Sequence, residues 1–127
     1  MKQTLKGLTK DLIYISETDA EIVPFVLGKA ERVTAEDVIK QTGGPPNEPV
    51  AVVDTEAFFA RLTAISDWFG PQETRQADRF KALKEYLDEE LKDIKVFKVG
   101  KIRISIYVVG IDRQGRLSGV KTTAVET

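Results

Sequence analysis

Two residue types that carry much of protein chemistry are missing from this chain of 127 residues, which has no cysteine and no histidine. Without them it cannot build a Ser-His-Asp triad, a Cys-His pair or a zinc site with nitrogen and sulfur ligands. Carboxylate, lysine and tyrosine chemistry remains, which is a narrower choice for a catalyst. The two absences therefore favour a binding protein, without a cofactor of its own, over an enzyme. Because disulfides are also excluded, we expect a cytoplasmic protein.

Long apolar runs and a strong charge of one sign are lacking as well. No stretch approaches the roughly 18 apolar residues of a membrane span, and Lys2, Lys6 and Lys10 interrupt the N-terminal segment, which leaves no signal-peptide core. The net charge is −1 and the pI is about 5.6, so the whole protein is not steered toward nucleic acid or anionic membrane. A chain of this length is most simply one domain, residues 1–127.

The charges are nevertheless unevenly distributed along the chain. Acidic residues outnumber basic ones in residues 1–91, and the reverse holds in 92–127. Two halves of one fold that neutralise each other are the simpler explanation, and an acidic end that faces a basic partner is the alternative. The basic residues of the C-terminal part lack interleaved exposed aromatics apart from Tyr107, so we expect no nucleic-acid binding. These residues are Lys98, Lys101, Arg103, Arg113, Arg116 and Lys121.

Helix and strand signals alternate along the chain. Thr34 and Asp54 are placed as helix N-caps, and Pro24 within a strand pattern indicates an edge or a bulge. The run 50–53 predicts a short buried strand, and the segment 16–21 predicts an acidic loop. The expected elements are helices over 3–11, 35–41, 55–63 and 74–92 and strands over 22–27, 50–53, 96–99, 102–109 and 117–125.

The C-terminal half carries the clearest pattern. The longest predicted helix has one apolar stripe of Phe80, Leu83, Leu87 and Leu91, and the opposite face carries the charge pairs Lys81/Glu85 and Lys84/Asp88. A two-residue turn at Gly100-Lys101 and a second turn at 112–115 join the last three strands into an antiparallel unit. Ile102, Ile104, Ile106 and Val108 are predicted to share one face of it. The fold class is therefore α/β or α+β, with layers and a mostly antiparallel sheet.

The last predicted strand leads directly into Glu126 and Thr127, with which the sequence ends. Terminal residues usually fray unless something holds them. If this strand is paired into a sheet, the α-carboxylate of Thr127 is held in a defined place beside the carboxylate of Glu126. Such a fixed anion is either incidental or a ligand for something cationic.

Several short segments, in this order and at this spacing, carry a family resemblance. They are Ser16-Glu17, 41–43, 52–54, Phe58-Phe59 with Arg61, Asp67-Trp68, 107–110, Gly115, Leu117, Gly119 and 125–127. Over residues 12–127 the chain resembles the nuclease A inhibitor family, whose members block a sugar-non-specific nuclease. The resemblance implies a three-layer α-β-α sandwich and a function as a protein inhibitor of a metal-dependent DNA/RNA endonuclease.

The resemblance also implies the residues that bind the nuclease. Thr127 would place its carboxylate on the catalytic Mg²⁺ of the nuclease, beside Glu126, and Glu17 would reach into the same active site. Asp67 and Trp68 would anchor the contact. A carboxylate is a hard oxygen ligand and can replace a substrate phosphate on such a metal, and a basic nuclease groove attracts acidic residues. We expect a monomer that forms a 1:1 complex and has neither membrane nor nucleic acid as a partner.

Simpler interpretations stand beside these roles. Glu17 can be solvated in its acidic loop, Asp67 can bond the amides of its own turn, and Trp68 can close the core. Two other functions also remain. One is an interaction module of the same fold with a non-nuclease partner. The other is a carboxylate enzyme that uses Glu17 or Asp67, which requires a concave pocket with two close carboxylates, one of them with a raised pKa.

Overall fold

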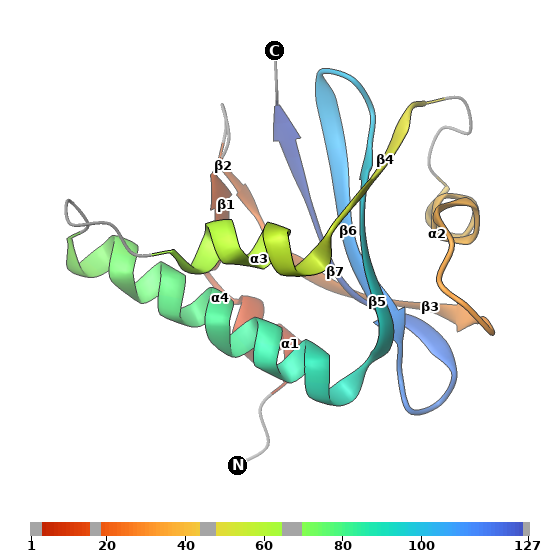
Figure 1. Ribbon diagram of the computed structural model, residues 1–127, viewed down its shortest axis with the longest axis horizontal. Coiled ribbons are helices and arrows are strands. Elements are labelled where there is room, and N and C mark those ends of the chain that lie inside the picture. The colour runs from red at the N-terminus through yellow and green to blue at the C-terminus, as the bar shows by residue number, and fades with distance from the viewer. Residues whose placement is uncertain (1–3, 16–18, 44–47, 65–69, 126–127) are drawn as a thin grey trace.

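A five-stranded antiparallel sheet divides the molecule into layers, and helices lie on both of its faces (Figure 1). The strand order is β3-β7-β6-β5-β4, and β1 and β2 form a separate two-stranded sheet. The computed structural model describes residues 4–15, 19–43, 48–64 and 70–125. The elements are α1 (Leu5–Thr9), β1 (Ile13–Ile15), β2 (Asp19–Glu21), β3 (Val23–Lys29), α2 (Ala35–Thr42), β4 (Val50–Val53), α3 (Thr55–Thr63), α4 (Pro71–Glu90), β5 (Lys92–Val99), β6 (Arg103–Ile111) and β7 (Arg116–Val125).

The predicted three-layer sandwich is confirmed by where the buried side chains lie. Alternate residues of β6 enter two different cores, because successive side chains of a strand point to opposite faces. Ile106 and Val108 belong to the core shared with α3 and α4, whereas Val109 belongs to the core shared with α2. Both faces of the central strands are thus covered. The first core also holds all four residues of the predicted stripe of α4, Phe80, Leu83, Leu87 and Leu91.

The predicted helix caps are confirmed. The Thr34 hydroxyl accepts a hydrogen bond from the N–H of Asp37 at 3.2 Å, and the Asp54 carboxylate accepts one from the N–H of Ala57 at 2.9 Å. Each bond satisfies one of the N–H groups that a helix start leaves free. Gly43 follows α2 in the left-handed conformation, with φ 73°, which is a common way for a helix to end.

Several details of the sequence prediction are wrong. The longest helix runs over Pro71–Glu90 and not over 74–92, and the strand after it begins at Lys92 and not at 96. The run 50–53 is not buried: β4 is an edge strand, and Val52 is 68% exposed. The predicted acidic loop 16–21 is too long, because 19–21 form β2 and pair with β1. Ile102 does not share the face of β6, since it lies in the connection between β5 and β6 and is 59% exposed. Short apolar or acidic segments of this kind have no periodicity that distinguishes these states.

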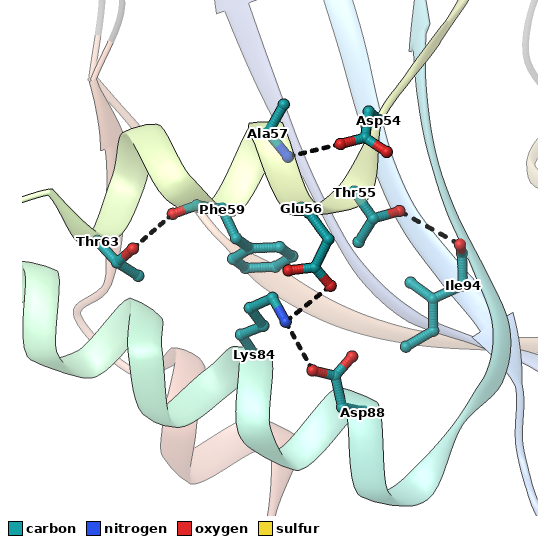
Figure 2. A network of polar contacts seen from close by, with 9 residues as sticks. All are labelled: Asp54, Thr55, Glu56, Ala57, Phe59, Thr63, Lys84, Asp88 and Ile94. Atoms are coloured by element: carbon teal, nitrogen blue, oxygen red, sulfur yellow. Dashed lines mark hydrogen bonds and ion pairs between the residues drawn. The ribbon is translucent and has the colours of Figure 1, made fainter.

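Lys84 joins α3 to α4, a contact that the sequence did not predict (Figure 2). Its ammonium group lies 2.7 Å from the carboxylate of Asp88, as predicted, and 3.1 Å from that of Glu56 on α3. The side chain is only 22% exposed. Hydrogen bonds with Asp88 and Glu56 raise the pKa of Lys84, although burial opposes them. A raised pKa means that the stabilisation is present below the ordinary pKa of the lysine and is lost as pH rises through the folded-state value.

We predict that Lys84→Met lowers the free energy of unfolding by about 1 kcal/mol at neutral pH, because it removes both ion pairs and keeps most of the apolar stem. Urea denaturation of the two proteins, followed by circular dichroism, measures the difference. The difference should shrink once the pH exceeds the raised pKa of Lys84. Lys81→Met, at an exposed position of the same helix, is the control, and an equal loss in both variants would contradict the link between α3 and α4.

Candidate partner-binding surface

The five residues that the sequence singled out for partner binding lie outside the described residues. They are Glu17, Asp67, Trp68, Glu126 and Thr127. The structure does describe the chain on both sides of 16–18 and of 65–69, and it describes β7 up to Val125. The places from which these three segments start can therefore be compared.

The β1–β2 hairpin, from which segment 16–18 starts, is held by two helices. The side-chain amide of Gln76 on α4 accepts a hydrogen bond from the N–H of Ile13 at 3.2 Å and donates one to the carbonyl of Asp11 at 3.3 Å. On α3, the ring of Phe58 stacks on that of Tyr14, with centroids 6.0 Å apart and planes 8° apart. Both strands of the hairpin pair in register, from Ile13 opposite Glu21 onward. These contacts with α3 and α4 hold the hairpin in place, and the hairpin in turn positions the chain on both sides of segment 16–18.

The hairpin also touches the final strand. The Thr122 hydroxyl of β7 donates a hydrogen bond to the carbonyl of Glu21 at 2.9 Å, and β7 remains paired with β6 up to Val125, which lies opposite Arg103. In Figure 1, β1 and β2 stand next to β7, and β7 ends at the upper edge of the molecule. The structure thus places the hairpin that leads to Glu17 beside the strand that leads to Thr127.

The segment that carries Asp67 and Trp68 starts elsewhere. In Figure 1, α3 ends and α4 begins at the left of the molecule, away from the upper edge where β7 ends. The start of α4 is well defined: the N–H of Gly70 donates a hydrogen bond to the carboxylate of Glu73 at 3.1 Å, and Pro71 occupies the first helical position, which suits its fixed φ. The described residues thus place the flanks of 65–69 on a different side from those of the other two segments.

The basic residues of the C-terminal part do not form one patch. Lys98 lies opposite Ile106 and Lys121 lies opposite Tyr107, so the two lysines are on different faces of the sheet. At the turn between β6 and β7, Arg113 pairs with Glu90 at 3.0 Å and Arg116 pairs with Asp112 at 3.1 Å. This dispersal does not provide the continuous basic track that a nucleic-acid backbone needs.

One hollow of the described surface brings several carboxylates together. It lies at the β6–β7 turn and is lined by Glu89, Glu90 and Asp112. Glu90 is engaged by Arg113. Burial favours a higher pKa for Asp112, but hydrogen bonds from the N–H groups of Arg116 and Gln114 and the charge of Arg116 outweigh it and lower the pKa. A lowered pKa suits a structural carboxylate and not a general acid. Among the described residues, no group of three or more His, Cys, Asp or Glu is arranged to hold a metal ion.

The helices described by the structure include none that is long and apolar enough to cross a membrane.

Comparison with known proteins identifies the family of the chain. A family model described as nuclease A inhibitor-like protein matches residues 1–127. Among curated proteins, the search found no match to the chain. The family match includes Glu17, Asp67, Trp68, Glu126 and Thr127, together with all the elements that support them.

Proposed function

The chain belongs to the nuclease A inhibitor-like family, and on that premise we propose that it inhibits a sugar-non-specific, metal-dependent endonuclease by occupying the active site. The observation that carries the proposal is the match of the family model to the whole chain. The protein acts here as a binding partner and not as an enzyme, in agreement with its lack of histidine and cysteine. We place this activity in the cytoplasm, with one inhibitor bound to one nuclease.

The proposed contact combines a metal ligand with acidic and aromatic anchors. The α-carboxylate of Thr127 binds the Mg²⁺ of the nuclease, in the position of a substrate phosphate, because a hard cation with few protein ligands accepts oxygen anions. Glu17 enters the same site, and Glu126 adds negative charge that a basic groove favours. Asp67 and Trp68 extend the interface, with Trp68 as an aromatic anchor of the kind that dominates binding energy.

Two features of the described residues support the part of this arrangement that combines Glu17 with Thr127. The hydrogen bond between Thr122 and Glu21 joins the hairpin that leads to Glu17 to the strand that leads to Thr127. Both elements are themselves held by packing and hydrogen bonds, so the two acidic segments start from a preorganised edge. Preorganisation raises affinity because less freedom is lost on binding.

The two hydrogen bonds of Gln76 with Ile13 and Asp11 lead to a prediction about inhibition. We expect Gln76→Ala to release the entry to β1 from α4 and to raise the inhibition constant roughly tenfold, since the segment with Glu17 then has more freedom to lose on binding. The stability loss should be only about 1 kcal/mol, the typical effect of losing hydrogen bonds to one side chain. Nuclease assays with increasing inhibitor measure the first quantity and thermal unfolding measures the second.

Gln72→Ala is the matched control for Gln76→Ala. Gln72 lies one turn earlier on α4, is exposed, and should leave both inhibition and stability unchanged. If Gln76→Ala inhibits as well as the parent protein while its stability falls, then Gln76 supports the fold and has no part in presenting Glu17.

The function itself is tested by nuclease assays with DNA and with RNA as substrates, in the presence of Mg²⁺. We expect the protein to abolish both activities of a sugar-non-specific endonuclease at equimolar concentration, because one occupied active site serves both substrates. A panel of such enzymes should include any that the same genome encodes. If none of them is inhibited at a large excess of the protein, the proposal fails.

A further inference from the structure

The two edge strands of the main sheet differ in how their outer backbone is protected. On β3, Pro24 has no N–H to offer, and the N–H of Gly28 donates to the side-chain carbonyl of Gln41 on α2 at 2.5 Å. The register of β3 with β7 also shifts between Val26 and Lys29. Proline, a bulge and a covering side chain are devices that keep an edge strand from pairing with another chain.

The opposite edge, β4, has none of these devices. Its four residues are uncharged, contain no proline and pair with β5 in four consecutive positions without a shift. The N–H of Gly100 donates to the carbonyl of Pro49 at 2.9 Å, which shows that the backbone of Pro49 faces β5. Backbone groups alternate in direction along an antiparallel strand. Val50 and Val52 therefore direct their N–H and C=O groups away from β5, toward the open edge.

The side chains of β4 give this edge a specific pattern. Val52 is 68% exposed and Val50 is 42% exposed, and positions two apart in a strand share a face. The exposed Glu48 and Asp54 flank the strand in sequence. Glu48 lies at a bend before Pro49, and Asp54 follows Val53 as the N-cap of α3, with its carboxylate bonded to the N–H of Ala57. We call these four residues, Glu48, Val50, Val52 and Asp54, the β4 stripe. In chain order, its side chains are acidic, apolar, apolar and acidic.

We propose that β4 binds an extended segment of a partner protein, which adds to the sheet as a sixth strand. The outward N–H and C=O groups of Val50 and Val52 hydrogen-bond to the backbone of this segment, the mode of binding known as β-augmentation. Its side chains opposite the β4 stripe are basic, apolar, apolar and basic, because opposite charges across two strands are favourable and like charges are not. This proposal is independent of the nuclease-inhibitor function.

A second copy of this chain is a poorer occupant than a segment with basic ends. If two β4 strands paired antiparallel with Val50 opposite Val52, Glu48 of each copy would stand opposite Asp54 of the other. Such a pairing sets like charges against each other at both ends. If Val50 paired with Val50 instead, or Val52 with Val52, a carboxylate would stand opposite a valine, and residues 47–55 offer no lysine or arginine to pair with it. The acidic ends of the β4 stripe therefore select a different chain, whose ends are basic.

The probe for this site is a capped, fluorescently labelled peptide of sequence Lys-Thr-Val-Thr-Val-Thr-Lys. The pattern is symmetric, so the peptide can bind in either strand direction. We expect saturable binding by fluorescence anisotropy, and we expect the largest amide shift changes in two-dimensional NMR at Val50 and Val52. The same peptide with glutamates in place of both lysines should bind at least tenfold more weakly, since each charge pair contributes up to about fivefold.

Two substitutions separate the backbone contribution from the charge contribution. Val52→Pro removes an N–H that faces away from β5 and should weaken binding of the lysine peptide at least tenfold, whereas Val52→Thr keeps that N–H and should weaken binding less. Glu48→Lys should reduce the preference for the lysine peptide over the glutamate peptide. Because residue 48 lies outside β4, this variant keeps the β4–β5 pairing and still tests the proposal if Val52→Pro does not fold. Nuclease inhibition should be unchanged in all three variants.

Three results would overturn the proposal. The first is equal binding of the lysine and glutamate peptides by both the parent protein and Glu48→Lys. The second is a set of amide shifts centred on another element, such as β3. The third is formation of a dimer through β4 in the absence of peptide, detected by analytical ultracentrifugation and abolished in Val52→Pro.

Discussion

A short tag added after Thr127 is expected to weaken inhibition of the nuclease by about a hundredfold or more, whereas the same tag before Met1 should have little effect. The reason is that a tag turns the α-carboxylate of Thr127 into an amide and places further residues between the inhibitor and the metal. An amide oxygen is neutral and cannot replace an anionic phosphate oxygen on Mg²⁺. A hundredfold weakening corresponds to about 2.7 kcal/mol, a reasonable value for the loss of one charged metal ligand.

The tag experiment needs a control for folding, because β7 is a central strand of the sheet. Both tagged proteins should unfold at the same temperature as the parent, since β7 is paired with β6 up to Val125 and neither tag changes a residue of this pairing. Deletion of Thr127 should weaken inhibition as well, because the new α-carboxylate, on residue 126, lies one residue short of the metal. Equal effects of the two tags would mean that Thr127 has no role in inhibition.

Gly119→Ala is expected to destabilise the protein by about 3–5 kcal/mol, at the upper end of what single substitutions cost. Gly119 lies in β7 with φ 158°, and a Cβ atom built there would stand 1.9 Å from the carbonyl oxygen of Val108 on β6. This neighbour is backbone of a central strand, so it cannot move away as a flexible side chain would. Thermal unfolding should show a decrease in Tm of roughly 10–20 °C.

Gly115→Ala is the matched control for this prediction. Gly115 also has a positive φ, 79°, but no heavy atom lies within 4 Å of the added Cβ. Only the conformational penalty remains, about 1–2 kcal/mol for a left-handed alanine. If the two variants lose the same stability, then the close approach of β6 to Gly119 contributes nothing, and the packing of β7 against β6 differs from the one described.

The parts of the fold that the sequence predicted are those with local signals. Helix caps such as Thr34 and Asp54 act on their own first turn, and the stripe of α4 repeats at helical spacing, so both can be found without knowing the rest of the fold. The last three strands are joined by short turns and were also predicted. The exposure of β4 and the pairing of β1 with β2 could not be found in this way, because each depends on what lies beside the strand.

The residues that support the candidate site had no signal in the sequence, whereas the site residues themselves did. The end of the last strand pointed to Glu126 and Thr127 as a fixed anion, and the family resemblance gave that anion a target and added Glu17, Asp67 and Trp68. Gln76 has no such signal, because a glutamine on a helix is ordinarily solvent-exposed and its contact with Ile13 joins residues 63 positions apart.

The most direct test of the central claim, that the protein occupies the active site of a nuclease, is a calorimetric titration of a sugar-non-specific endonuclease with the protein in Mg²⁺. A nuclease variant that binds DNA without cleaving it allows the titration to be repeated in the presence of saturating duplex DNA. We predict a 1:1 complex whose apparent affinity falls in proportion to the DNA present, because inhibitor and substrate compete for one site. Binding that is unaffected by DNA, or no binding at all, would contradict the account.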